Sequence, residues 1–249
     1  SDVYKRQGGS TSSNSDGSIT STVSANTTAG FSIVTYTASG SNATIGHGLG
    51  VAPAWIIVKG RTTDNNWRVG HDGLTSWTYR INIEGTAAES SQANVWNSTA
   101  PTSSVFSIGT SSSVNDSGVV HMAYCFVEKK GYSRFGAYTG NANADGAFVY
   151  TGFKPAWIMI KGANAGTHWT MYDNKRDPSN TTTQNLRANT NEAETTDHDI
   201  DMLSNGFKHR GTGSAGNGNY NYIYMAFAEN PFVTSTGIPC LLYTSDAAD

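Results

Sequence analysis

The chain has very few cysteines: only Cys125 and Cys240 occur among its 249 residues. Two cysteines are too few for a disulfide framework or a cysteine-rich metal cluster, which excludes the small disulfide-stapled domains. Because Cys125 lies within the apolar run 122–126, we expect a buried, reduced thiol that packs as a small hydrophobic side chain. The six histidines show no spacing typical of zinc ligands. The sequence therefore predicts neither a metal site nor a cofactor.

Charged residues are also scarce. They make up 14% of the chain, against about 25% in an average domain. The net charge of −3 includes no block of basic residues, so we expect no nucleic-acid partner, whose phosphates such a block would neutralise. No apolar run approaches the roughly 18 residues that a transmembrane helix needs, and the first residues show no signal-peptide pattern. We therefore expect no membrane partner.

Sustained helical periodicity is missing as well. Glycine, serine, threonine and asparagine, which are typical of turns, are abundant instead, and aromatic residues make up 11% of the chain. Short segments rich in β-branched and aromatic residues, such as 31–37 and 105–108, end at turns. About seven such strands per hundred residues are typical of a β-sandwich or a jelly roll.

The strongest positive signal is a duplication. The segment GVAPAWIIVKG at 50–60 recurs as GFKPAWIMIKG at 152–162, and subtracting 55 from 157 places the two tryptophans 102 residues apart. The same interval separates Trp67 from Trp169 and Tyr36 from Tyr138. A period of this length indicates two copies of one unit. We predict an all-β fold of two tandem antiparallel β-sandwich, jelly-roll-like repeats, the first at 25–131 and the second at 132–234.

The two ends differ in character from the repeats. The first seven residues and the last ten resemble translated sequencing-adapter read-through, which recurs at the ends of metagenomic gene predictions. Two ordinary disordered tails are the alternative. Residues 8–17 are predicted as a linker, and 18–24 as a short edge strand or an extended lead-in. We therefore assign 1–24 and 235–249 to linker and artefactual sequence outside the fold.

The Pro-Ala-Trp strands are expected to be buried on both faces. The four residues that follow Ala54 and Ala156 are all apolar, whereas a strand at a solvated surface alternates apolar and polar residues. The apolar segments 121–126 and 222–228 share this property. Each repeat then has two central strands whose second face needs a cover. The other repeat, another subunit or a layer of loops would each provide it.

Two motifs are typical of ligand-binding sites, but the residues around them do not fit such a site. Residues 211–216 match the glycine pattern of dinucleotide-binding loops, but no helix follows them, so a hairpin loop is favoured. Asp197, Asp199 and Asp201 alternate, so their carboxylates would share one face of a strand. A calcium loop needs glycine and glutamate where this chain has Met202 and Lys208. A solvated strand face or loop is the better interpretation.

Four residues remain as candidates for a ligand surface. Asp72 and Asp173 each end a repeated strand that begins with tryptophan, so they are the obvious carboxylates for glycoside cleavage. An aspartate that accepts turn N–H groups after a strand is the plainer alternative. Trp77 and Trp96 do not recur and are the better candidates for exposed aromatics, although core packing also fits them. The recurrence of Trp67 and Trp169 favours a packing role for that pair.

Several longer phrases are specific enough to compare with a known family. They are ANTTAGFSIVTYT at 25–37, GHGLG at 46–50, DGAFVYTGFKPAW at 145–157 and YMAFAENPF at 224–232. Together they resemble a repeat domain of uncharacterised structural, tail-fibre-like proteins of marine tailed bacteriophages. The resemblance covers about 25–234 and departs most at 75–119. A variable recognition surface or simple drift would explain that divergence.

The resemblance implies a role in a virion and no enzymatic residue. It favours a non-enzymatic tail-fibre or appendage segment whose partners are other virion proteins and a host-surface glycan. A homotrimer, as in many fibres, and a monomer in which the repeats pack on each other are both open. A carbohydrate-active tail enzyme such as a capsule depolymerase is the alternative from a different class. A structural module that only joins other fibre parts is the third.

Overall fold

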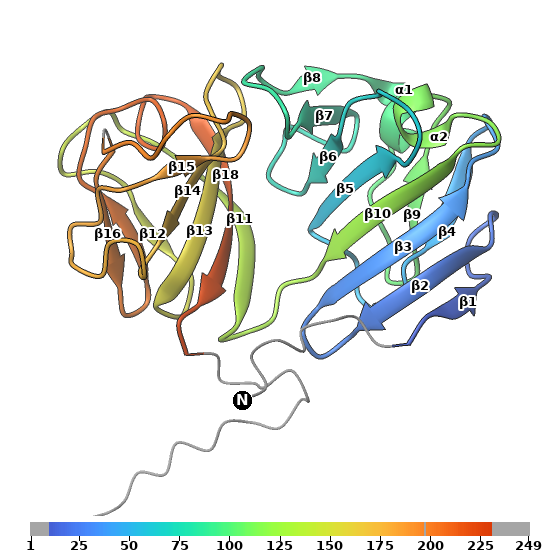
Figure 1. Cartoon of the computed structure of the whole chain (residues 1–249), viewed down its shortest axis with the longest axis horizontal. Coiled ribbons are helices and arrows are strands. Elements are labelled where there is room, and N and C mark those ends of the chain that lie inside the picture. Colours follow the sequence, from blue (N-terminus) through green and yellow to red (C-terminus); the bar gives the residue numbers. More distant parts are fainter. Residues whose placement is uncertain (1–9, 197, 231–249) are drawn as a thin grey trace, which may run out of the picture.

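The computed structural model describes residues 10–196 and 198–230. Its regular structure is almost entirely antiparallel β-sheet, arranged as two sandwich-like halves that follow one another along the chain (Figure 1). The predicted all-β class is confirmed. The expectations about 1–9, 235–249, Asp197 and Cys240 lie outside the described residues.

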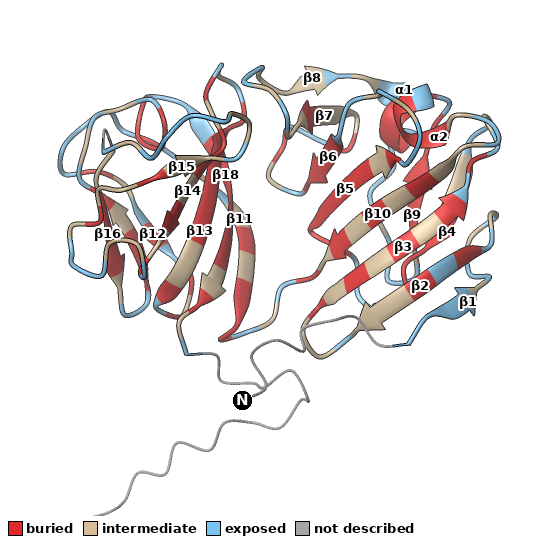
Figure 2. Ribbon diagram, viewed as in Figure 1, coloured by how far each residue is buried: buried red, intermediate tan, exposed pale blue. Residues whose placement is uncertain are grey.

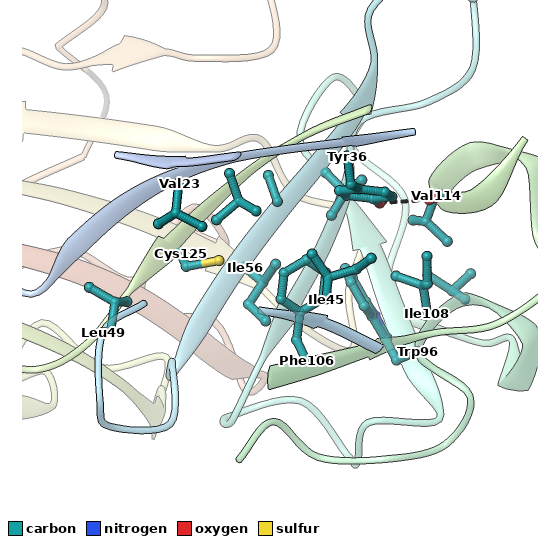
Figure 3. Packing of buried hydrophobic residues seen from close by; sticks show 14 of the residues in the cluster. Val23, Tyr36, Ile45, Leu49, Ile56, Trp96, Phe106, Ile108, Val114 and Cys125 are labelled. Atoms are coloured by element: carbon teal, nitrogen blue, oxygen red, sulfur yellow. Dashed lines mark hydrogen bonds between the residues drawn. The ribbon is translucent and has the colours of Figure 1, made fainter. Parts of the chain in front are cut away.

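The first half is built on an eight-stranded sheet in the order β1-β2-β3-β10-β5-β6-β7-β8. These strands are β1 (Ser12–Asn14), β2 (Ser21–Asn26), β3 (Phe31–Thr37), β5 (Trp55–Gly60), β6 (Arg68–His71), β7 (Tyr79–Asn82), β8 (Ser90–Ser91) and β10 (Val120–Phe126). A second layer of β4 (Ala43–Gly46), β9 (Val105–Ile108) and the helical turns α1 (Ala93–Trp96) and α2 (Ser112–Asn115) covers one face. Side chains from both layers, including Ile45, Ile56 and Phe106, form the core between them (Figure 3).

The second half repeats this plan with fewer strands. Its larger sheet has the order β11-β18-β13-β14-β15, and a three-stranded sheet in the order β12-β17-β16 provides the second layer. The strands are β11 (Ser133–Thr139), β12 (Phe148–Tyr150), β13 (Pro155–Gly162), β14 (Thr170–Asp173), β15 (Leu186–Arg187), β16 (Ile200–Leu203), β17 (Gly206–His209) and β18 (Asn221–Ala228). The core between the layers includes Ile158, Phe207 and Tyr224.

The linker expectation for residues 8–17 is wrong at Ser12–Asn14, which forms β1 and pairs with β2 in the register Ser12↔Val23. The pattern hid this strand because its side chains are polar and mostly exposed. An antiparallel pair needs only main-chain groups to form its hydrogen bonds. The segment 18–24, predicted as an edge strand or lead-in, contributes the start of β2, which lies between β1 and β3.

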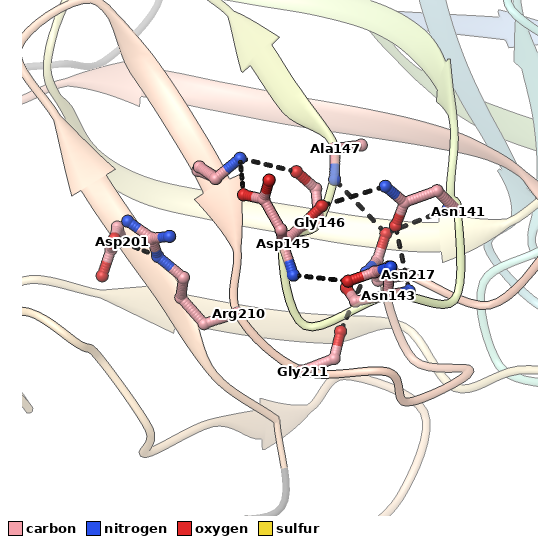
Figure 4. A network of polar contacts seen from close by, with 10 residues as sticks. Asn141, Asn143, Asp145, Gly146, Ala147, Asp201, Arg210, Gly211 and Asn217 are labelled. Carbon is pink, nitrogen blue, oxygen red and sulfur yellow. Dashed lines mark hydrogen bonds and ion pairs between the residues drawn. The ribbon is translucent and has the colours of Figure 1, made fainter.

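The duplication extends to individual hydrogen bonds. Asn115 in the first half accepts from the Ser39 and Gly40 N–H groups and donates to the Ser41 and Gly109 carbonyls. Asn217, which is 217 minus 115 or 102 residues later, accepts from Asn141 and donates to Asn143 and Gly211 (Figure 4). Both asparagines are about 1% exposed. Each one ties the loop after β3 or β11 to the loop before β10 or β18.

A tyrosine accompanies each asparagine. The Tyr36 hydroxyl donates to the Val114 carbonyl at 2.6 Å (Figure 3), and the Tyr138 hydroxyl donates to the Gly216 carbonyl at 2.7 Å. The Tyr36 ring stacks on His121, its partner in the neighbouring strand β10. The Tyr138 ring stacks on Tyr222, its partner in the neighbouring strand β18. Since the partners are again about one period apart, the two halves fold by the same local contacts.

The other half covers the second face of the Pro-Ala-Trp strands. A third cluster, here called the inter-repeat core, lies between the two large sheets and includes Trp55, Ile57, Phe135, Met159 and Trp169. In β5, burial on both faces holds, since Trp55, Ile56, Ile57 and Val58 are all buried. In β13 it holds only in part, because Trp157, whose ring packs on Phe227, is not fully covered. Of the three covers expected from the sequence, the structure selects the other repeat.

Polar contacts also cross between the halves. The Trp169 indole N–H donates to the Asn82 carbonyl at 2.9 Å, and the Lys161 ammonium donates to the Thr86 carbonyl at 3.1 Å. The Glu89 N–H donates to the Ala163 carbonyl at 2.6 Å. These bonds satisfy buried polar groups of the second half with main-chain acceptors and donors of the first. They fix the direction in which the two apolar faces meet.

Candidate functional site

The interpretation of Trp77 and Trp96 as surface residues is wrong. Trp96 is fully buried and Trp77 is 9% exposed, and their rings pack edge to face with centroids 5.8 Å apart. A Cβ atom on Gly70 of β6 would lie 2.4 Å from Trp77 and 2.9 Å from Trp96, so this glycine makes room for both indoles. The core of the first half therefore contains both rings, as the alternative interpretation allowed. Figure 2 shows buried residues on the ribbon of α1 and along β5 and β6 in this half.

Asp72 and Asp173 do not occupy equivalent places. Trp55 pairs with His71 across β5 and β6, whereas Trp157 pairs with Asp173 across β13 and β14, so the counterpart of Asp173 is His71. The interval between the aspartates, 173 minus 72, is 101 and not 102, and this difference was readable in the sequence. The repeat therefore does not present a matched pair of carboxylates.

Each aspartate is engaged by its own turn. Asp173 accepts from the N–H groups of Lys175 and Arg176, as the plainer alternative expected, and forms an ion pair with the Arg176 side chain. Partial burial alone would raise its pKa, but these bonds and the guanidinium lower the pKa of Asp173 overall. Asp72 accepts from the Trp77 indole at 3.0 Å, and desolvation raises the pKa of Asp72 despite that bond.

The remaining motifs fold as loops and ion pairs. Residues 211–216 lie in the connection between β17 and β18, with no helix after them, which confirms the hairpin-loop interpretation. Asp201 is buried and paired with Arg210 at 2.5 Å (Figure 4), so it does not belong to a solvated face. Within 10–196 and 198–230, no three His, Cys, Asp or Glu side chains come together in a way that would hold a metal ion. Cys125 is a free, buried thiol as predicted, and burial raises the pKa of Cys125 to about 12.

The structure places an exposed tryptophan where the sequence predicted packing. Trp67 is 36% exposed, whereas its counterpart Trp169 is fully buried in the inter-repeat core. Its ring lies nearly parallel to that of Tyr124, with centroids 6.5 Å apart, and Tyr124 lies nearly parallel to Phe31 at 6.4 Å. Three aromatic rings with closely similar orientation thus cross the outer face of β3, β10 and the start of β6.

An open groove runs along two of these rings, those of Trp67 and Tyr124, and is here called the Trp67 groove. One part, of about 430 Å³, is lined by Ile57, Trp67, Ile83, Glu84, Tyr124 and Ala188. The adjoining part, of about 300 Å³, is lined by Lys59, Gly60, Arg61, Trp67, Met122 and Tyr124. Trp67 and Tyr124 belong to both parts, and Ala188 is contributed by the second half. The groove therefore lies at the open margin of the inter-repeat core.

The groove exists because β10 is only half covered. The sequence predicted burial of both faces of 121–126, but the residues of β10 alternate between buried and intermediate. Met122 and Tyr124 belong to the partly exposed set, whereas β18, the equivalent strand, is buried at five consecutive residues. Sequence hydropathy missed this difference because Met122 and Tyr124 are apolar whether or not a neighbour covers them.

Polar groups hold Trp67 in place at the rim. The Glu84 carboxylate accepts from the Trp67 main-chain N–H at 3.1 Å and from the Asn66 side chain. The Lys59 ammonium is directed onto the loop that carries Trp67, where it donates to the Thr63 and Asn65 carbonyls. Both ends of the segment 63–67 are thereby pinned, which gives the exposed ring a supported position.

Comparison with known families gives one match. A family model described as a domain of unknown function, DUF7483, matches residues 4–231. No curated protein and no solved structure matches the chain. Among the described residues, the only helices are four-residue turns, far shorter than a membrane-crossing helix.

Proposed function

We propose that the chain, which belongs to the DUF7483 domain family, is a non-enzymatic structural protein of a virion, a segment of a tail fibre or related appendage that helps to recognise a host-surface glycan. The phrases at 25–37, 145–157 and 224–232, which resemble tail-fibre-like proteins, support the virion location. Other virion proteins are its proposed partners.

The inter-repeat core is the observation that carries the proposal. The two sandwiches are joined through buried tryptophans, and the ring centroids of Trp55 and Trp169 are 5.7 Å apart. They therefore form one rigid unit instead of two domains connected by a flexible linker. A fibre segment has to hold a recognition surface in a fixed geometry, and a shared core of this kind serves that need. The low charge and abundant hydroxyl and amide groups suit a surface that binds sugars.

Both candidate carboxylates are bound by other groups of the protein, which supports a non-enzymatic role. Asp72 is bound by Trp77 and Asp173 by its own turn and Arg176, so both have structural work that accounts for them. A capsule depolymerase requires an acid and a base or nucleophile on opposite sides of the scissile bond. Loss of polysaccharide chain length on incubation with the protein, abolished in Asp72→Asn or Asp173→Asn, would establish the enzymatic alternative.

The test of the virion role is a measurement of particle composition. Purified particles of a phage that encodes the intact reading frame are analysed by mass spectrometry of their proteins. We expect peptides from 25–234 at a stoichiometry comparable to other appendage proteins. Peptides found in the infected-cell lysate but absent from banded particles would contradict the proposal.

A further inference from the structure

We infer that the Trp67 groove is a binding site for a linear oligosaccharide that carries carboxylate groups. This inference rests on the proposed recognition of a glycan, and it names both the site and the chemical class of the sugar. The site was not among the candidates that the sequence offered, since Trp67 was assigned to packing.

The aromatic row supplies the surface for the sugar rings. Phe31, Tyr124 and Trp67 follow one another at 6.4 and 6.5 Å with interplanar angles of 9° and 14°. Pyranose rings expose C–H groups on their faces and hydroxyls on their edges, so they pack on aromatic rings while their edges stay hydrated. Tyr124 and Trp67 line the groove, and Phe31 continues the row beyond the lining residues. A row of rings along an open groove suits a chain of sugars better than one compact ligand, which needs an enclosed pocket.

The charged residues at the rim of the groove favour a sugar that carries carboxylate groups. The Lys59 ammonium and the Glu84 carboxylate are both directed to the segment 63–67, where main-chain and amide groups bind them. Arg61 is exposed, lines the groove beside Trp67, and forms no ion pair with any other residue that the structure describes. A guanidinium binds a carboxylate through two parallel hydrogen bonds, a geometry that a neutral sugar does not offer.

The position of the groove argues for recognition instead of folding. Its wall at Ile83 and Glu84 comes from the stretch 75–119, in which the sequence departs most from the family that it resembles. The second repeat has no equivalent groove around Trp169, because Asn82 and the first half cover that side chain. Among the described residues the groove therefore belongs to the Trp67 side of the repeat and has no counterpart at Trp169.

The test uses the whole chain and a panel of linear oligouronates made of galacturonate, mannuronate, guluronate or glucuronate. Binding is measured by calorimetry and by the fluorescence of the exposed indole. We expect saturable binding to at least one member, weakened about tenfold or more in Trp67→Ala. Arg61→Gln is expected to weaken binding about fivefold and to remove most of its dependence on salt.

Matched controls distinguish binding at the Trp67 groove from non-specific binding elsewhere on the protein. Tyr150→Ala removes an aromatic ring that is 58% exposed on β12, far from the groove in the chain, and is expected to bind as the parent does. The methyl ester of the bound oligouronate has the same backbone without charge and is expected to bind about as weakly to the parent as the acid binds to Arg61→Gln. Circular dichroism checks that each variant is folded.

Four results would overturn the inference. Three are no binding to any oligouronate, equal affinity of Trp67→Ala and the parent, and equal affinity for the acid and its methyl ester. Capture of a peptide in the groove in place of the sugar, lost in Trp67→Ala, would reassign the site to a protein partner and also overturn it. Because particle composition is a separate measurement, a chain absent from virions that still binds the oligouronate overturns only the proposed function.

Discussion

Trp55 of the first half packs against Trp169 of the second half, with ring centroids 5.7 Å apart and planes inclined by 50°. Both side chains are fully buried, and each is supported by a further aromatic ring or a hydrogen bond: Trp55 by Phe135, and Trp169 by the Asn82 carbonyl. The Pro-Ala-Trp motif therefore serves to join the repeats. The apolar side chains of its first copy, at 55–58, are buried on both faces of β5.

Removal of the Trp169 ring should destabilise the whole chain. Trp169→Ala leaves a cavity in the inter-repeat core and an unpaired Asn82 carbonyl, for which we expect a loss of about 3–5 kcal/mol in the free energy of unfolding. Urea titration followed by circular dichroism measures it. Trp67→Ala, the equivalent change at the exposed position, should cost less than about 1.5 kcal/mol. Equal losses at the two positions would contradict the asymmetry between the halves.

The sequence predicted the scaffold well because scaffold signals are local. The interval of 102 residues, the apolar runs of β5 and β13, and the turns after 37 and 139 each depend on neighbours along the chain. Whether a tryptophan is exposed does not depend on its neighbours along the chain. Trp77 and Trp96 are buried because a loop and α1 fold back over Gly70, and Trp67 is exposed because the second half stops short of it. Both facts depend on contacts between segments far apart in sequence.

The buried Lys161 should give a stability that rises with pH in the alkaline range. Burial lowers the pKa of Lys161 from its ordinary 10.5 to about 8, while its ammonium donates to the Thr86, Gly162 and Ala165 carbonyls. Between those two values the unfolded chain binds more protons than the folded chain, so the free energy of unfolding increases with pH. Lys161→Met should remove this slope. Lys59→Met, which alters the counterpart in the first half, is the control and should keep it.

Two buried histidines should weaken the fold in acid. Burial is the largest cause that lowers the pKa of both His71 and His209 from the ordinary 6.5 to about 3. The contribution of each is fully present above 6.5 and is lost as the pH falls toward 3, because only the unfolded chain takes up the proton there. His71→Asn keeps an acceptor for the Gly73 N–H and should flatten the acid limb of the curve. An unchanged limb in this variant would show that other groups govern acid unfolding.

The Asn217 amide should matter far more than its size suggests. It accepts from the Asn141 N–H and donates to the Asn143 and Gly211 carbonyls, so Asn217→Ala leaves several partly buried main-chain groups unpaired. We expect a loss of about 2–4 kcal/mol and faster amide exchange in 141–147. Asn115→Ala should do the same to 39–41 without affecting the second half. A loss below about 0.5 kcal/mol in both variants would show that water replaces the network.

The contact between the halves has one place where it can be tested by a covalent bond. A Cβ atom on Gly73, in the loop after β6, would lie 2.8 Å from the Cβ atom of Ala137 on β11. Two cysteines there need only a small adjustment to reach the separation of about 3.5–4.5 Å that a disulfide requires. The measurement is the mass and the non-reducing mobility of Gly73→Cys/Ala137→Cys in a Cys240→Ser background after mild oxidation. We expect a disulfide between 73 and 137 of the same chain; a free dithiol, or two chains linked by a disulfide, would show that the halves do not meet at this place.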